Sequence, residues 1–218
     1  MAKGLFTTSC IFAVVVLAFS GCATTGETEI ETEAKTELET MVETTVETTV
    51  ETTVETKAPK FTLRVNCAAI EPYTDKGGNL WLPDQYMEEG NTWGVVNGMT
   101  VDRGDLGITG TNAPKIYETE CYSMSAYKFK VPNGQYTVRL HFAETYDGIT
   151  GEGQRVFSVT INDKVVLEDF DPYKEGGGFA KPVVKEFKDV TITNEELVIG
   201  FISDIQNPEI NGIEILSE

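Results

Sequence analysis

The stretch Tyr127-Lys-Phe-Lys-Val-Pro-Asn-Gly-Gln-Tyr-Thr-Val-Arg-Leu-His-Phe142 decides the fold class of this 218-residue chain. Apolar and polar residues alternate in it on both sides of Pro132-Asn-Gly134, which is a typical hairpin signal. A period of two indicates a β-strand with one buried face, because successive side chains of a strand point to opposite faces. The stretch therefore predicts two short strands joined by a turn.

The same alternation recurs in the chain from about residue 60 onward. It is found at Phe61–Val65, Phe157–Ile161 and Ile213–Ile215, and Asn162-Asp163 gives a second hairpin signal. About eight to ten short strands without a helical period predict an all-β fold, an antiparallel β-sandwich of two sheets. Residues 71–115, rich in Gly, Asn and Asp, are the exception. We expect them to form a long irregular segment of the kind that carries binding sites.

Residues 1–21 have the three-part pattern of a secretory signal. Lys3 gives a positive start, residues 11–19 are apolar, and small residues precede Cys22. This ending is similar to a bacterial lipobox, although Phe19 stands where that pattern usually has leucine. We expect lipid chains such as palmitate on Cys22, which would anchor the protein to a membrane. The alternative is an ordinary cleaved signal in which this cysteine has no role.

Residues 22–59 have the composition of a linker. Between residues 23 and 57 there are ten Glu and thirteen Thr, no aromatic residue, and a Val-Glu-Thr-Thr repeat from Val42 onward. Glutamates four residues apart repel one another on a helix, and Thr and Val are poor helix formers. The segment cannot bury enough apolar surface to offset its ordering entropy, so we expect a disordered tether. It would hold a folded domain, residues 60–218, away from a membrane.

Charge and motif content exclude several functions. The chain has 35 acidic and 17 basic residues, a net charge of −18, so we expect no nucleic acid partner. No nucleophile elbow is present, and Gly176-Gly-Gly178 is not followed by the Lys-Ser/Thr of a phosphate-binding loop. The only histidine, His141, lies mid-strand and is expected to be packed. Glu144 and Asp147 could form the carboxyl pair of a glycoside hydrolase, which keeps catalysis as an alternative.

We expect no cofactor and no metal ion. The alternative for a metal is a calcium ion bound by carboxylates of the loops. These are Asp75, Asp84, Asp102 and Asp105. Two cysteines, Cys67 and Cys121, remain in the domain; they could form a disulfide in an oxidising compartment or stay as buried free thiols.

Aromatic residues among polar ones give the first indication of a ligand. Several Tyr and Trp residues stand in predicted loops beside Asp, Asn and Gln. Such a ring offers a flat apolar face and a polar edge, which match the C–H patches and the hydroxyl rim of a sugar. The alternative is that the rings only fill the ends of the sandwich.

Six motifs, in order over nearly all of residues 61–217, resemble those of the malectin domain family. They are Arg64-Val-Asn-Cys67, Tyr73–Asp84, Ile116–Tyr122, Tyr136–Tyr146, Arg155–Asn162 and Asn207-Pro-Glu-Ile-Asn-Gly-Ile-Glu-Ile215. The resemblance implies a jelly-roll-like, galactose-binding-like sandwich that binds glycans without cleaving them. It also implies a glycoside hydrolase as a partner, because bacterial members often accompany such enzymes.

The resemblance further implies where the sugar binds. By position, the sugar-contacting residues of the family fall on three aromatic rings and three hydrogen-bonding side chains. The rings are Trp93, Tyr122 and Tyr146, and the hydrogen-bonding residues are Asp147, Asp204 and Gln206. Asp147 stands where the family has an aromatic residue, and Gln206 where it has an acidic one.

Together these features predict a lipid-anchored protein of the bacterial cell envelope that captures an oligosaccharide or polysaccharide. A protein–protein or adhesion module that docks an envelope protein is the alternative, and a glycoside hydrolase is a third reading.

Overall fold

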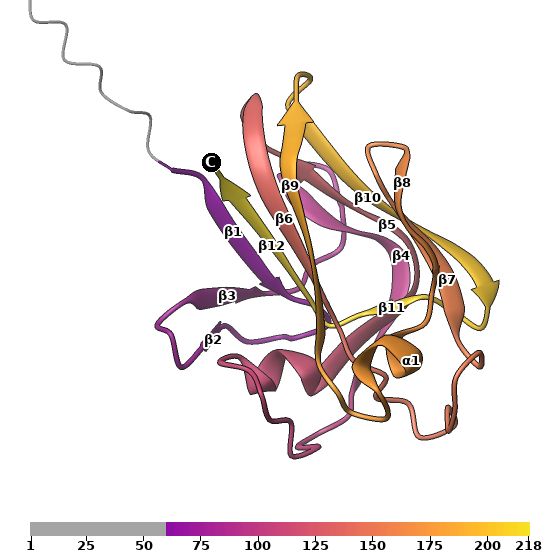
Figure 1. The fold of residues 1–218 in the computed structure, drawn as a ribbon. Coiled ribbons are helices and arrows are strands. Elements are labelled where there is room, and N and C mark those ends of the chain that lie inside the picture. Colours follow the sequence, from indigo (N-terminus) through magenta and orange to yellow (C-terminus); the bar gives the residue numbers. More distant parts are fainter. Residues whose placement is uncertain (1–59) are drawn as a thin grey trace, which may run out of the picture. The chain divides into compact units, whose positions relative to one another are not determined.

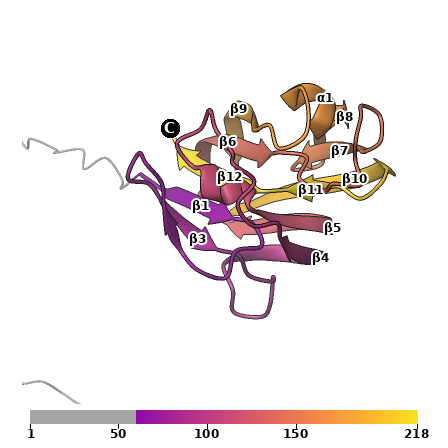
Figure 2. The same ribbon diagram turned by 90° about the horizontal axis from the view of Figure 1, so that it is seen from below.

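Two β-sheets pack face to face in the computed structural model, which describes residues 60–218 (Figures 1 and 2). The expected signal, the expected linker and Cys22 lie outside the described residues. Within residues 60–218, no helix has the length and apolar character needed to cross a membrane. The prediction of an all-β antiparallel sandwich is confirmed.

The first sheet has six strands in the order β2-β3-β1-β12-β6-β9. Their bounds are β1 (Thr62–Asn66), β2 (Tyr73–Thr74), β3 (Leu80–Pro83), β6 (Gly134–Phe142), β9 (Val183–Ile192) and β12 (Gly212–Ser217). Neighbouring strands are antiparallel except β1 and β3, which run parallel.

The second sheet has the order β11-β5-β10-β7-β8, and β4 pairs with the other edge of β5. Its strands are β4 (Trp93–Asp102), β5 (Thr119–Lys130), β7 (Val156–Ile161), β8 (Lys164–Phe170), β10 (Glu196–Ile205) and β11 (Glu209–Ile210). All of these pairs are antiparallel. A 3-10 helix, η1 (Pro114–Tyr117), precedes β5, and a short helix, α1 (Pro172–Gly176), lies between β8 and β9.

The core lies between the sheets and follows the predicted alternation. Val138, Leu140 and Phe142 of β6 are fully buried in the same cluster as Phe129 of β5 and Phe157 of β7. Because every second side chain of β6 enters this cluster, the period-two pattern is satisfied by burial of one strand face.

The expectation of an irregular segment at residues 71–115 holds only for 84–92 and 103–113, because β2, β3 and β4 lie within the segment and η1 begins at its end. Strand β4 contains Gly94 and Gly98, and glycine is more typical of loops than of strands. A Cβ on Gly94 would lie 2.5 Å from the backbone nitrogen of Met87, so only glycine lets that neighbouring segment approach β4. Gly94, a residue type common in loops, is thus required here by the close packing of β4 against the segment at Met87.

The two hairpin signals have different outcomes. Asn162 and Asp163 join β7 to β8 with φ values of 47° and 63°, as a tight hairpin turn requires. Pro132-Asn-Gly134 instead joins strands of different sheets, β5 and β6. The apolar faces of these two strands meet across the core, so the turn is a corner between sheets and the hairpin expected there is wrong.

His141 is packed, as predicted. It is buried on β6, and hydrogen bonds join its Nδ1 to the Tyr117 hydroxyl at 2.9 Å and its Nε2 to Glu214 Oε1 at 3.0 Å. The Trp81 ring meets the imidazole edge-to-face, with 5.2 Å between the ring centroids. Both ring nitrogens therefore have partners within the fold.

Candidate functional site

A cavity of about 330 Å³ lies on the side of β5 that faces away from the core. Its walls come from β4 and the residue after it, from β5, from the loop between β6 and β7, and from the segment between β10 and β11. The lining residues are Val101, Arg103, Glu120, Tyr122, Tyr146, Arg155, Gln206 and Asn207. The structure thus brings together Tyr122, Tyr146 and Gln206 of the expected sugar-binding residues.

Tyr146 is the most accessible ring of the cavity, with 41% of its surface exposed. The guanidinium carbon of Arg103 lies 5.2 Å from the ring centroid, in cation–π geometry. A Cβ on Gly148 would come within 2.5 Å of ring atoms Cε1 and Cζ. The backbone N–H of Tyr146 donates to Glu144 Oε1 at 2.9 Å. Arg103 and Gly148 therefore lie against this ring, and Glu144 holds the backbone that carries it.

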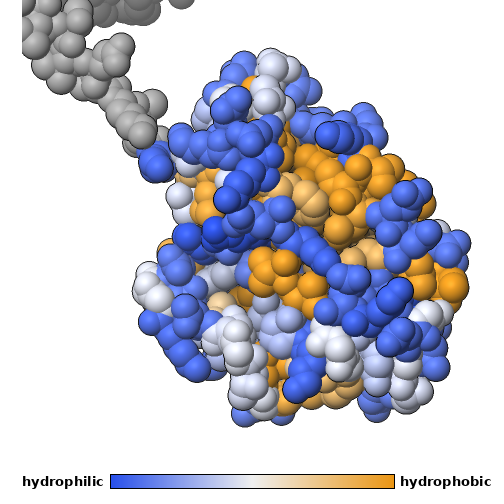
Figure 3. Space-filling model, in the orientation of Figure 1, coloured by the Kyte–Doolittle hydropathy of each residue, from blue (hydrophilic) through white to orange (hydrophobic). Residues whose placement is uncertain are grey.

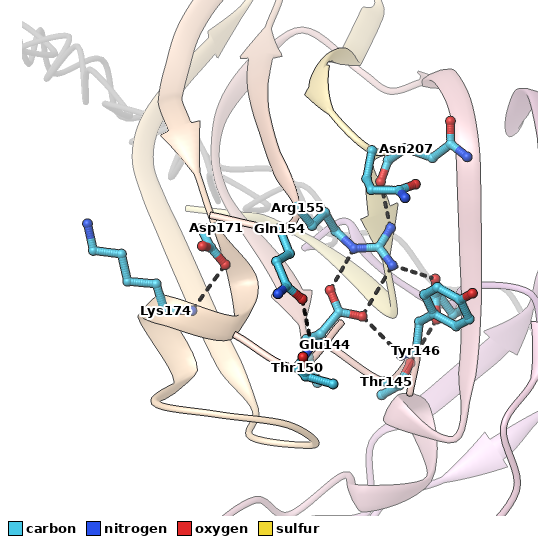
Figure 4. A network of polar contacts seen from close by, with 12 residues as sticks. Glu144, Thr145, Tyr146, Thr150, Gln154, Arg155, Asp171, Lys174 and Asn207 are labelled. Carbon is cyan, nitrogen blue, oxygen red and sulfur yellow. Dashed lines mark hydrogen bonds and ion pairs between the residues drawn. The ribbon is translucent and has the colours of Figure 1, made fainter. Parts of the chain in front are cut away.

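Arg155 connects two walls of the cavity (Figure 4). Its Nε donates to Glu144 Oε2 at 2.6 Å and its Nη2 to Glu144 Oε1 at 3.2 Å. Its Nη1 donates to the backbone oxygen of Asn207 at 2.6 Å. Arg155 and Glu144 are both buried, so this paired contact holds the segment beside Gln206 against the loop after β6.

Glu120 forms the second ion pair of the cavity. Its Oε2 accepts from Nε and Nη2 of Arg103, each at 3.0 Å, and from the Thr145 hydroxyl at 2.8 Å. Its Oε1 lies 3.8 Å from Arg155 Nη2. The two guanidinium groups are thus neutralised by carboxylates beneath the cavity.

Glu209 is a third carboxyl on this side of the sheet. It pairs with Tyr122 across β11 and β5, and directly opposed side chains project from the same face. It is fully buried, and neither of its side-chain oxygens has a hydrogen-bond partner. Burial and the neighbouring Glu120 raise the pKa of Glu209 well above its usual range, because Arg155 only partly offsets them.

Three expected residues lie outside the cavity lining. Trp93 begins β4 and stacks on Phe129, with 6.2 Å between ring centroids. It pairs with Phe129, seven positions along β5 from Tyr122, which is about 24 Å at strand spacing. The distance follows from β4 being one extended strand. Asp147 and Asp204 are exposed near the cavity but do not line it.

The alternative sites considered from the sequence do not form as expected. Glu144 is fully buried in its contact with Arg155, whereas Asp147 is exposed, so the two make no accessible carboxyl pair. Asp75 accepts hydrogen bonds from Trp81 and from its own turn, and Asp84 accepts from Tyr127. In residues 60–218 no three His, Cys, Asp or Glu side chains are grouped to hold a metal ion.

Cys67 and Cys121 are both buried and unbonded in the structure. Burial raises the pKa of the Cys121 thiol to about 12 and that of Cys67 well above its usual value. Thiolates are the reactive form, so these two groups are inert in the folded domain. Of the two alternatives, the structure therefore contains buried free thiols and no disulfide between these cysteines.

A second hollow, of about 560 Å³, lies between the unpaired edges of β8 and β9. Ile161, Val166, Phe187 and Val190 line it together with charged residues of both signs. Figure 3 shows hydrophobic areas interrupting the hydrophilic surface on the face of the molecule seen in Figure 1. This groove has no tyrosine, so we place the candidate site at the smaller cavity.

Sequence reasoning missed the charged residues of the site. In the sequence, Arg103, Glu120 and Arg155 cannot be distinguished from solvated surface charges, because a sequence does not show which charged side chains form ion pairs. The signal that could have found two of them is position: Glu120 stands two residues before Tyr122, and Arg155 begins one of the motifs quoted above. Residues on one strand face alternate, so Glu120 had to share the face of Tyr122.

The family model described as "Malectin domain" matches residues 61–213. The chain belongs to the malectin domain family. A probable LRR receptor-like serine/threonine-protein kinase of Arabidopsis thaliana is 36% identical over 124 residues, 49% of this chain and 12% of that protein. The chain thus spans a small part of the curated relatives that it matches.

Two solved structures contain a domain with a similar fold. A β-glucuronidase of Bacteroides uniformis has a TM-score of 0.64 and 26% identity, over 72% of this chain and 18% of the enzyme. The plant receptor-like kinase FER, in complex with the peptide RALF23 and LLG2, has a TM-score of 0.56 and 20% identity, over 71% of this chain and 48% of that chain. These findings indicate an extracellular or envelope-facing binding module whose partner is a carbohydrate or a protein.

Proposed function

We propose that this malectin domain binds a carbohydrate, without cleaving it, in the cavity between Tyr122, Tyr146 and Gln206. The observation that carries the proposal is the convergence of two tyrosines and two amide residues in one cavity of about 330 Å³. That volume is in the range of small-ligand sites. The accessible Tyr146 ring supplies a stacking face, and the amide of Gln206 supplies hydrogen bonds for hydroxyls.

The charges of the cavity favour an uncharged sugar. Arg103 and Arg155 are already paired with Glu120 and Glu144, so neither guanidinium carries an uncompensated positive charge that would attract a carboxylate or sulfate. Exposed Asp102 and Asp147 nearby would repel an anion. We therefore expect neutral oligosaccharides to bind more tightly than oligosaccharides of uronic acids.

Affinity for one sugar should be weak. Each hydroxyl exchanges a bond to water for a bond to protein, which gains only about 0.5–1.5 kcal/mol. A dissociation constant on the order of millimolar to micromolar follows. We propose that lipid on Cys22 holds many copies at the bacterial cell envelope, where a polysaccharide could bridge several domains and gain avidity.

Alanine variants of the two tyrosines test the site. Titration of the full-length protein with neutral gluco-oligosaccharides should show about tenfold weaker binding for Tyr146→Ala, because a stacking face worth about 1–2 kcal/mol is lost. Tyr86→Ala is the matched control, since Tyr86 is similarly exposed, at 48%, but lies outside the cavity. Binding that is unchanged in Tyr146→Ala and Tyr122→Ala would refute the proposal.

A protein partner is the second candidate. The groove between β8 and β9 favours it, because two unpaired strand edges flank the apolar side chains of Val166, Phe187 and Val190. The FER neighbour was solved with a peptide and a protein. Capture of an envelope protein that excess sugar does not displace, and that Val166→Lys in the groove abolishes, would support this function.

A further inference from the structure

The side of the sheet beneath the cavity holds more carboxyls than guanidinium groups. Glu120, Glu144 and Glu209 are each at most 1% exposed, and two arginines, Arg103 and Arg155, face them. If all five groups were ionised, one negative charge would remain uncompensated in a buried cluster, which is costly.

Hydrogen bonding shows which carboxyl is left over. Glu144 receives two bonds from Arg155, and Glu120 receives two from Arg103. Glu209 receives none at either oxygen, although it lies on the same face of the sheet as Glu120. The two ion pairs are complete without Glu209, so charge balance is reached only when this carboxyl is neutral.

Glu209 also lies close to the cavity wall in the chain. Asn207, whose backbone oxygen Arg155 holds at 2.6 Å, is two residues before it, and Gln206 is three residues before it. An ionised Glu209 would compete with Glu144 and Asn207 for Arg155 and would repel Glu120. Loss of the Arg155 bond to Asn207 would release the wall that carries Gln206.

We propose that Glu209 is a positioning residue of the cavity: as a neutral carboxyl it leaves Arg155 on Glu144 and Asn207, and its ionisation would loosen the wall at Gln206. The effect on ligand binding rests on the function proposed above, whereas the charge state of Glu209 does not. The charged groups that act on Glu209 come from four neighbouring segments. These groups are Arg103 after β4, Glu120 on β5, Glu144 after β6 and Arg155 before β7, with neutral Cys67, Cys121 and Tyr117 nearby.

The direction in which pH changes the folding stability follows from the state that holds the Glu209 proton more tightly. The unfolded chain releases the Glu209 proton near pH 4.3, whereas the folded domain keeps it to higher pH. Between these values the unfolded state binds fewer protons, so stability falls as pH rises. The ratio of the unfolding constants of wild type and Glu209→Gln should grow by up to about tenfold per pH unit, because glutamine mimics the neutral acid and never ionises.

The test compares the full-length wild type with Glu209→Gln in urea unfolding from pH 4 to 9, without sugar. The exposed Glu196→Gln is the control, and its profile should run parallel to that of wild type. Parallel profiles for wild type and Glu209→Gln would overturn the proposal. If the variant does not fold, ¹³C NMR of glutamate side chains in the wild type decides: every carboxyl titrating at or below about pH 4.5 would overturn it equally.

A second arm measures sugar binding over the same pH range. We expect wild-type affinity to fall at least tenfold toward alkaline pH and the affinity of Glu209→Gln to stay constant. Equal pH dependence in the two proteins would overturn the positioning role. Absence of sugar binding in wild type at every pH would instead refute the proposed function, while the unfolding profiles would still decide the charge state of Glu209.

Discussion

At the scale of single residues, the position of Tyr146 depends on a neighbour without a side chain. Gly148 lies so close to the phenol ring that a methyl group would come within 2.5 Å of Cε1 and Cζ and 2.7 Å of the hydroxyl. The ring is partly exposed, so it can turn away without disturbing the core. Gly148 therefore controls the stacking face more than the stability of the fold.

Gly148→Ala should weaken sugar binding about three- to tenfold and change the free energy of unfolding by less than about 1 kcal/mol, because the displaced group is a surface ring. Titration calorimetry and urea unfolding measure the two quantities. Gly151→Ala in the same loop is the control, since a Cβ there meets nothing closer than 3.7 Å. Equal binding by both variants would show that Tyr146 is not held by this contact.

At the scale of elements, a row of alternating charges joins four strands of the first sheet. Arg64 of β1, Glu214 of β12, Arg139 of β6 and Glu186 of β9 are successive partners in the register. Glu214 is the buried member, and its Oε2 accepts from Arg64 Nε at 2.7 Å. Each strand is thus joined to the next by an ion pair as well as by the backbone ladder.

Glu214→Gln should lower the free energy of unfolding at neutral pH by about 1–3 kcal/mol, because hydrogen bonds to a buried charged group are lost. Burial disfavours the charge, but hydrogen bonds from His141 and Arg64 outweigh it and lower the pKa of Glu214. A lowered pKa gives stability that is present above the unfolded value, about 4.3, and is lost as pH falls through the folded value.

Chemical unfolding at pH 7 and at about pH 3 measures this prediction. The difference between wild type and Glu214→Gln should be largest at pH 7 and should shrink in acid. The exposed Glu168→Gln on β8 should show little difference at either pH. A Glu214→Gln difference that grows in acid would contradict the stated direction of the pKa.

At the scale of the whole molecule, the domain is expected to work while attached to a surface. The chain carries a net charge of −18, and ten of its acidic residues lie between residues 23 and 57. Such a chain is repelled by anionic lipid headgroups, so charge alone would not keep it at a membrane. Attachment then depends on the lipid proposed for Cys22.

Cys22→Ala should move the protein from the membrane fraction to the soluble fraction of cells. Fractionation and immunoblotting measure the distribution, and Thr24→Ala, two residues further on, should stay with the membrane. A Cys22→Ala protein that remains in the membrane fraction would refute the lipid anchor.

The fold class could be predicted because it depends on local pattern. The alternation of Val138, Leu140 and Phe142 can be satisfied by a strand with one buried face, and the structure buries these residues together. The order of the family motifs likewise predicts Tyr122, Tyr146 and Gln206 as ligand-contacting residues. The strand pattern and the family motifs each depend on residues close together in the chain, so they can be recognised without knowledge of distant contacts.

The composition of the site could not be predicted in the same way. Trp93 is excluded from the cavity by the length of one strand, and β5 and β6 separate into two sheets although only a short turn joins them. Arg103, Glu120, Arg155 and Glu209 acquire their roles from one another, across more than a hundred residues of chain. Burial, pairing and protonation of such groups depend on which charges the folded chain brings within a few ångströms, and sequence distance carries no information about that.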